Sequence, residues 1–491
     1  ALERRAYEEA IVDYERALGS LDPESAEDRE AHLELLVELA RVVWMLGERS
    51  RGRDLLDRAA AEARELGRAD LLAEGALIRG GVRAWTEAGV VDDELVALLE
   101  EAIARYPEGD SIVRAKMTAR LGSELYFRPG ATERRHALSA EAIGMARRLG
   151  DPGTLAYVLN SAHWGMFEPG NAAEREVLAR EMLQLATESG DRGLEGASRS
   201  WLTGDLLEMG DVDAAVTEAD AGLALAEAVR QPDLLWGALV HQGAIAMLQG
   251  RIDDAIRLAD DALTIGGGAE IESALQMYGV LQIATRRLRG GLEELVEPTL
   301  AMVEQYPLIP AWRCGLAYVY RELERLDEAR EQLEVIAADD FSGLTLDGNW
   351  KVGAAILATV CASLDDRPRA EHLYAGLAPF ADTCVIAGLP ADVLGCAHHF
   401  LMLLAATLER WDDVERHAAA ALAGNAALGA PAWVATTQHE LAVILVRRNE
   451  PGDLDRARGL LNECLAACDE LGMPYLAGKA RRALEEVASS A

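Results

Sequence analysis

Apolar residues recur along the chain at helical spacing, and glycines separate the apolar stretches at regular intervals. Gly210, Gly250 and Gly290 follow one another at 40-residue steps, each at a break between two such stretches. Around Gly250, small residues occupy the positions where two antiparallel helices would have to approach closely: Gly243, Ala246, Ala255, Ala259 and Ala262. A helix pair of this kind cannot bury its apolar face alone, so successive pairs must stack. The pattern predicts an all-α solenoid.

The segment from Leu36 to Leu66 has the complete pattern of one helix pair. Ala40 and Val43 fall on its first helix, Gly47 marks the turn, and the second helix carries Gly52, Leu56 and Ala59. This arrangement resembles a tetratricopeptide repeat, in which small residues near the turn let two helices approach closely. The resemblance recurs along most of the chain, at Thr203, Gly210 and Ala215; Gly243, Gly250 and Ala255; Ala317, Tyr320 and Ala329; Ala370, Tyr374 and Leu377; and Ala405, Ala418 and Ala421.

The repeat is longer than a usual tetratricopeptide repeat, which has about 34 residues. The extra residues fall at joints such as Gly150-Asp151-Pro152, Gly190-Asp191 and Gln231-Pro232-Asp233. Each joint combines a residue suited to ending one helix with an Asp or Pro suited to starting the next. At a period near 40 the chain has room for about 12 antiparallel helix pairs.

We divide the predicted superhelix into a partial repeat at 1–35, an N-terminal half at 36–265 and a C-terminal half at 266–491. The less regular segments Ala84–Pro107, Gly266–Gly268 and Phe341–Trp350 are expected to be loops or changes of superhelical direction, and the glycine run a flexible joint. The first residues have the pattern of a second helix without its first, and the chain begins without Met. We therefore expect it to start inside a longer protein.

The chain is strongly acidic, which bears on its partners. With 48 Lys and Arg against 83 Asp and Glu, the net charge is −35. Because affinity for nucleic acid or anionic lipid depends on Lys and Arg, we expect neither nucleic acid nor membrane as a partner of this segment. The acidity is explained by a solvated surface, with a basic partner as the alternative.

The cysteines and the termini carry little chemistry. Six cysteines, at 314, 361, 384, 396, 464 and 468, lie in apolar, helix-like contexts and are predicted to be small core residues. The charged N-terminus does not resemble a secretion signal, and the longest uncharged stretch, Val352–Leu364, is too short to span a bilayer. We expect a cytoplasmic protein.

No catalytic, metal or cofactor motif emerges from the sequence. Gly478-Lys479-Ala480 lacks the glycine spacing and hydroxyl of a phosphate-binding loop, and His439-Glu440 lacks the second histidine of a zinc site. His398 and His399 are adjacent and would point about 100° apart on a helix. Asp253-Asp254 and Asp412-Asp413 are explained by the positive end of a helix dipole. We expect no enzyme activity, no cofactor and no metal in this segment.

The remaining candidates are large side chains in or near the first helices of the pairs. In tetratricopeptide folds these helices line the concave groove, where aromatic side chains would hold a ligand or peptide; the alternative is that they fill gaps between stacked repeats. The candidate groove residues are His163, Trp164, Trp201, Trp236, His241, Trp312, Arg313 and Trp350. An aromatic anchor beside Arg313 would suit a peptide or an acidic small molecule.

Over its whole length the chain also resembles the repeat region of large actinobacterial-type regulatory ATPases. The resemblance rests on stretches such as WTEAGVVDDELVALLEEAIARYP, PAWRCGLAYVYRELERLDEAREQLEVIAADDF and DGNW. In that family an upstream signal-transduction ATPase is joined to a nucleotide cyclase or a DNA-binding output domain, and neither module is present in this sequence. The resemblance implies a sensor or interaction arm that binds a small-molecule inducer or a protein. The alternatives are a free-standing scaffold or peptide receptor and, less favoured, an enzyme with its site inside the superhelix.

Overall fold

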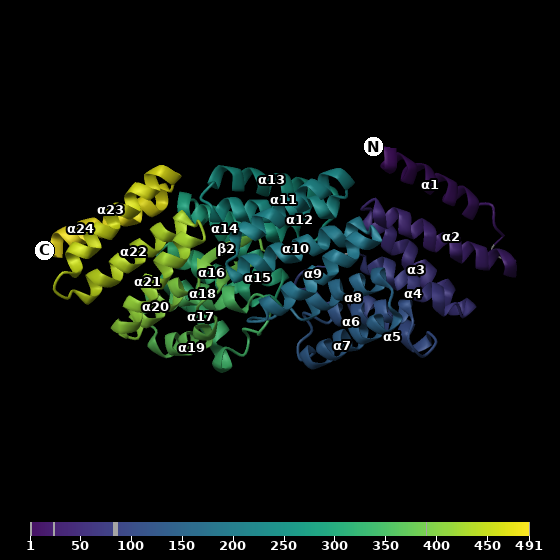
Figure 1. Ribbon diagram of the computed structural model, residues 1–491, viewed down its shortest axis with the longest axis horizontal. Helices are drawn as coiled ribbons and strands as arrows, with labels where there is room; N and C mark the ends of the chain where they lie inside the picture. Colours follow the sequence, from purple (N-terminus) through teal and green to yellow (C-terminus); the bar gives the residue numbers. More distant parts are fainter. Residues whose placement is uncertain (1, 23–24, 82–86, 389, 491) are drawn as a thin grey trace.

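The computed structural model describes residues 2–22, 25–81, 87–388 and 390–490. Within them the chain forms an elongated stack of helices, with the two termini at opposite ends (Figure 1). The α-helices are α1 (Leu2–Leu18), α2 (Ala26–Met45), α3 (Arg49–Leu66), α4 (Ala69–Gly80), α5 (Asp93–Arg105), α6 (Ile112–Glu124), α7 (Thr132–Leu149), α8 (Pro152–Gly165), α9 (Ala172–Ser189), α10 (Arg192–Met209), α11 (Val212–Val229), α12 (Pro232–Leu248), α13 (Ile252–Gly268), α14 (Ala274–Arg289), α15 (Val296–Gln305), α16 (Pro310–Glu322), α17 (Leu326–Phe341), α18 (Trp350–Leu364), α19 (Arg367–Leu377), α20 (His398–Thr407), α21 (Trp411–Ala427), α22 (Pro431–Arg448), α23 (Asp453–Leu471) and α24 (Pro474–Ser490). Two short 3₁₀ helices, η1 (Leu292–Leu295) and η2 (Ala378–Phe380), and two strands complete the described elements.

This architecture confirms the predicted all-α solenoid. The 24 helices of the described residues pack on their sequence neighbours, as the expected dozen pairs require. The proposed division at residue 265 falls within α13 and stays a prediction.

The joints between helices have the predicted chemistry. Gly150 ends α7 in the left-handed region, where glycine avoids the clash of a side chain, and the Asp151 carboxylate accepts a hydrogen bond from the Thr154 backbone N–H at the start of α8. Pro152 occupies the first turn of α8. Asp253 and Asp254 lie in the first turn of α13, as expected for acidic residues at a helix N-terminus.

Close approach of paired helices depends on small residues, as the pattern around the turns predicts. Gly52 on α3 faces the Trp44 ring on α2, and a Cβ at Gly52 would lie 2.8 Å from that ring. Ala40 and Ala59 of the same pair are almost fully buried. The side-chain volume missing at these positions is the space that the neighbouring helix fills.

The three segments predicted to be irregular differ in their structure. Gly266–Gly268 form the last turn of α13 and are no loop, contrary to the expectation of a flexible joint; Gly266 packs against Trp236 and Ala274, so its lack of a side chain serves helix packing. Residues 342–349 form the irregular connection expected before α18. Of the segment from Ala84 to Pro107, residues 84–86 lie outside the described residues, and most of the remainder forms α5.

The superhelix curves so that segments far apart in the sequence come into contact. The Ala88 backbone N–H donates to Ser273 Oγ, and the Gln276 side chain donates to the Ala88 carbonyl. The C-terminal helix α24 packs against α14, and the Tyr475 hydroxyl on α24 donates to the Glu322 carbonyl on α16. The inner faces of these helices therefore surround a common interior.

A β-hairpin between α19 and α20 enters this interior. Its strands β1 (Cys384–Ala387) and β2 (Asp392–Cys396) are antiparallel and buried along their length. Strand β1 packs on α10 and α18, and β2 packs on α12, α14 and α21. The helical context expected for Cys384 and Cys396 is therefore wrong, although all six cysteines are buried as predicted.

Candidate ligand-binding cavity

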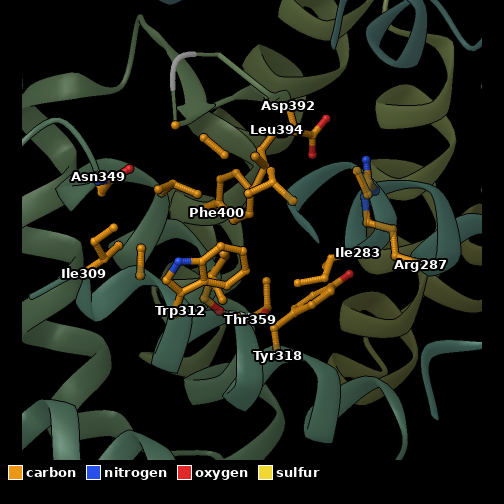
Figure 2. A pocket seen from close by; sticks show the side chains of 18 of the residues that line it. Ile283, Arg287, Ile309, Trp312, Tyr318, Asn349, Thr359, Asp392, Leu394 and Phe400 are labelled. Atoms are coloured by element: carbon orange, nitrogen blue, oxygen red, sulfur yellow. Dashed lines mark hydrogen bonds between the residues drawn. The ribbon is translucent and has the colours of Figure 1, made fainter. Parts of the chain in front are cut away.

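The interior of the superhelix contains an apolar cavity roofed by the hairpin. Its volume is about 150 Å³, and its walls come from α14, α16, α18, α20, α22 and the hairpin, with contributions from α8 and α24. Aromatic rings contribute to the lining beside aliphatic side chains, among them Tyr126, Trp164, Phe167, Trp312, Phe400 and Trp433. Figure 2 shows Trp312 and Phe400 facing each other across the space, with Ile309 and Ile283 beside them.

Trp312, on the floor of the cavity, is held in place by a hydrogen bond and by packing. It is 7% exposed, and its indole N–H donates to Gln276 Oε1 at 3.3 Å. Gly279 on α14 leaves room for the ring, because a Cβ there would lie 3.2 Å from Trp312. A ring fixed by a hydrogen bond and by packing presents a preformed apolar face to the cavity.

The hairpin forms the roof of the cavity, and two side chains fix its position by hydrogen bonds. The Trp433 indole N–H donates to the Val393 carbonyl at 3.0 Å, and Asn425 Oδ1 accepts from the Cys396 backbone N–H at 2.8 Å. Gly395 has a φ of +71°, and a Cβ there would lie 2.6 Å from Asn425 Oδ1. Glycine is required at this position both by the backbone conformation and by the close approach of α21.

One end of the cavity is lined by four charged side chains that neutralise one another. Arg321 pairs with Glu322 and with Glu440, and Lys479 lies 3.2 Å from Glu322 and 3.9 Å from Glu440. Burial alone would raise the pKa values of the two carboxyls, but the cations beside them hold both below the usual range. The quartet thus contains two positive and two negative charges.

Two further charged residues that line the cavity form no ion pair. Arg287 on α14 and Asp392 at the start of β2 both line the cavity and are 8% and 4% exposed, respectively. They face each other in Figure 2 but form no direct ion pair. Burial raises the pKa of Asp392, and the positive charge of Arg287 offsets only part of this effect.

A buried histidine lies next to this wall. His399 on α20 lines the cavity and has its Nδ1 2.9 Å from Thr437 Oγ1. Burial lowers the pKa of His399 to about 4, so the ring is neutral at physiological pH. His399 therefore adds a polar but uncharged edge to the cavity.

Of the predicted groove residues, only Trp164 and Trp312 line this cavity. Trp201 donates its indole N–H to Asn160 Oδ1 at 2.8 Å, and it borders with His241 a separate hollow of only about 10 Å³. Trp236 packs on Gly266 between helices, and Trp350 packs on Gly376 and on the Phe380 ring. Arg313 points away toward α17, where it donates to Gln332 Oε1 at 2.7 Å.

His163 belongs to a buried charge network outside the cavity. Its Nε2 lies 2.7 Å from Asp205 Oδ2, and Arg175 Nε lies 2.9 Å from Asp205 Oδ1. Burial lowers the pKa of His163, while Asp205 works in the opposite direction. The network connects α8, α9 and α10 and lies beneath the start of the hairpin.

Sequence patterns missed Arg287 and Asp392, and they brought up His399 only as the neighbour of His398 in a possible metal pair. Arg287 lies in the run Arg286-Arg287-Leu288-Arg289, which has the composition of any basic helix C-terminus. Asp392 follows a Gly-Leu-Pro-Ala stretch that signals a turn but no site. Their proximity depends on the hairpin folding back onto α14, a contact for which the sequence has no local signal.

The described part of the chain contains no cluster of three or more His, Cys, Asp or Glu side chains placed to hold a metal ion. Within the same residues, no helix combines the length and the apolar character needed to cross a bilayer.

Comparison with known proteins adds little to this description. No protein-family model matches the sequence, and no curated protein matches it. Among solved structures, the chain is similar to one described as a circular tandem repeat protein with novel repeat topology and enhanced subunit contact surfaces, at 15% identity and a TM-score of 0.15, over 99% of this chain and 87% of the other. At so low a TM-score the two do not superpose as wholes, and nothing about the site follows from the similarity.

Proposed function

We propose that this chain is a non-catalytic binding arm that takes a small molecule into the cavity at the centre of its superhelix. The observation that supports the proposal is the apolar, aromatic-lined cavity itself. Protein interiors are close-packed, so a hollow lined by fixed aromatic rings and a few convergent polar groups is typical of a ligand site. Helical solenoids commonly use their inner surfaces for binding.

A ligand in this cavity would be positioned to influence the shape of the whole array. It would contact α14 and α16 from the middle of the chain, α22 near its end, and the hairpin between them. A ligand that prefers one arrangement of these elements shifts the equilibrium toward it. This is the behaviour required of a sensor arm.

The resemblance to regulatory ATPases gives the proposal its biological setting. In that setting the array is the sensor of a larger cytoplasmic regulator, and ligand binding alters how the array contacts an upstream ATPase or output domain. The alternative is a free-standing scaffold or peptide receptor, for which the cavity would be incidental and the outer helix surfaces would do the binding.

The test is a thermal-shift screen of sugars, nucleotides, amino acids and short peptides on two variants beside the unmodified protein. Gly315 on α16 lines the cavity, and a Cβ there would lie 3.7 Å from Ile283, so Gly315→Leu puts a side chain into the space without a backbone clash. Gly459→Leu on α23, where nothing lies within 4 Å of a Cβ, is the matched control. A ligand at 100 times its Kd adds about 2.7 kcal/mol to the stability.

The proposal predicts a compound that raises the Tm of the unmodified protein and of Gly459→Leu but not that of Gly315→Leu. If every stabilising compound acts equally on all three proteins, or if none acts at all, the cavity is not the binding site. The scaffold alternative is then favoured.

A further inference from the structure

Arg287 is the one arginine in the last turn of α14 without an anionic partner among the described residues. Its neighbours have partners: Arg286 pairs with Glu294, and Arg289 lies 2.6 Å from Asp253. Arg287 forms no ion pair or hydrogen bond with any described residue, and its Nε is buried and unpaired. Its guanidinium lies over the Trp433 ring, 4.1 Å from the centroid.

Asp392, at the start of β2, likewise has no ion-pair partner among the described residues. One carboxylate oxygen accepts from the Val393 backbone N–H at 2.9 Å, and no described side chain donates to the carboxylate. A buried carboxylate has room for several donors and is costly when they are missing. Asp392 thus presents an acceptor to the cavity, and Arg287 presents a donor.

The other charges around the cavity do not supply the missing partners. Arg321, Glu322, Glu440 and Lys479 are joined in the neutral quartet, and His399 is bound to Thr437. Arg287 and Asp392 are therefore one positive and one negative group that line the cavity without an ion-pair partner among the described residues. A ligand with one anionic and one cationic group would satisfy both without adding net charge to the interior.

The apolar part of the cavity sets the size of the rest of the ligand. A cavity of about 150 Å³ in another protein takes a benzene ring, which matches the volume here. Trp312 and Phe400 offer apolar surface to the ligand, and Ile283 adds more beside Arg287 (Figure 2). The space fits one ring or one branched alkyl group and is too small for an oligosaccharide or a folded peptide.

We propose that the cavity binds a zwitterion of the α-amino-acid type with a single-ring or branched apolar side chain. Its carboxylate pairs with the Arg287 guanidinium, its ammonium group pairs with Asp392, and its side chain packs against Trp312 and Phe400. This assignment rests on the proposed function, since it names the ligand class of the same cavity.

Isothermal titration calorimetry with three related probes tests the assignment on the unmodified full chain. L-Phenylalanine has both charged groups, 3-phenylpropionate lacks the ammonium group, and 2-phenylethylamine lacks the carboxylate. We expect L-phenylalanine to bind, and the loss of either group to weaken binding by about tenfold or more. Equal affinity for all three probes would overturn the proposal, because the charged walls would then not be used.

Two variants test which residue binds each charged group of the ligand. Arg287→Met keeps an apolar contact with Trp433 and is expected to weaken L-phenylalanine by about tenfold or more while leaving 2-phenylethylamine nearly unchanged. Asp392→Asn should weaken L-phenylalanine similarly and leave 3-phenylpropionate unweakened. Arg286→Met, one residue away with its own partner Glu294, is the control and should bind as the unmodified protein does. If Arg287→Met does not fold, the probe series on the unmodified protein still decides.

The outcomes separate this inference from the proposed function. If L-phenylalanine does not bind, but another compound stabilises the unmodified protein and not Gly315→Leu, the cavity is a ligand site and the amino-acid assignment is wrong. If no compound distinguishes Gly315→Leu from Gly459→Leu, both are wrong. Binding of L-phenylalanine that survives both Arg287→Met and Asp392→Asn also overturns the assignment.

Discussion

The Lys351 ammonium group lies 2.6 Å from Glu208 Oε1, and both side chains are almost fully buried. Lys351 is on α18 and Glu208 on α10, so the pair joins two parts of the array that are far apart in the sequence. Lys351 also donates to Thr383 Oγ1 and to the Cys384 carbonyl, which ties the start of the hairpin to the same point. The position of the cavity roof therefore depends on this pair.

Glu208→Gln should destabilise the protein by about 3 to 5 kcal/mol, because it leaves the buried cations Lys351 and Arg175 without their shared carboxylate. Urea denaturation measures the change in the free energy of unfolding. Glu409→Gln, which breaks the exposed pair with Arg367, is the control and should cost at most about 1 kcal/mol. Similar losses for both variants would show that the buried network does not hold the array together.

Gly395→Ala should destabilise the protein by about 1 to 3 kcal/mol more than Gly150→Ala does. Both glycines have positive φ angles, so both variants incur backbone strain of about 1 to 2 kcal/mol. Only at Gly395 would the new Cβ meet neighbours, 2.6 Å from Asn425 Oδ1 and 2.9 Å from Trp433; nothing lies within 4 Å at Gly150. Equal shifts of the unfolding midpoint would mean that the hairpin does not pack tightly on α21 and α22.

The helices and their joints were predictable, because each depends on residues close together in the sequence. Gly150-Asp151-Pro152 ends one helix and starts the next through its own backbone and side chains. The same local patterns placed Gly52 opposite a neighbouring helix.

The hairpin was not predictable in the same way. Both strands are buried on every side, so Cys384–Ala387 shows no alternation of apolar and polar residues and resembles a buried helix segment. For a related reason, the sequence could not show which tryptophans line the cavity and which fill gaps between helices. Trp312 and Trp236 have similar sequence surroundings, and only the curvature of the superhelix decides that one lines the cavity and the other fills a gap between helices.

Gly52→Ala tests the close approach of α2 and α3. The added Cβ would lie 2.8 Å from the Trp44 ring, so we expect a loss of stability of about 1 to 3 kcal/mol from overpacking. Gly459→Ala, in open space on α23, should instead gain about 0.5 to 1 kcal/mol from helix propensity. Differential scanning calorimetry of the two variants compares them, and a gain at both positions would contradict the packing of this pair.

Asp392→Asn should make the protein more stable at neutral pH and leave its stability unchanged in acid. Burial raises the folded-state pKa of Asp392 above the unfolded value of 3.8, so the folded state binds more protons than the unfolded state just above that pH. Stability contributed by this site therefore falls as the pH rises from about 3.8 through the folded-state pKa. Asn has no such dependence and still accepts the Val393 N–H bond.

Unfolding free energies of both proteins across this pH range check the prediction. The advantage of Asp392→Asn should appear as the pH rises and then stay constant. An advantage for the unmodified protein at neutral pH would mean that Asp392 has a cationic partner in the free protein.

A crystal of the chain soaked in bromobenzene, whose bromine is located by anomalous scattering, tests directly whether the cavity in the superhelix takes up a ligand. A preformed apolar cavity at the centre of the superhelix predicts a bromine peak among Trp312, Phe400 and Ile283, and no such peak in crystals of Gly315→Leu. An interior without a peak in the unmodified protein, or the same peak in both crystals, would contradict the claim that this cavity is the binding site.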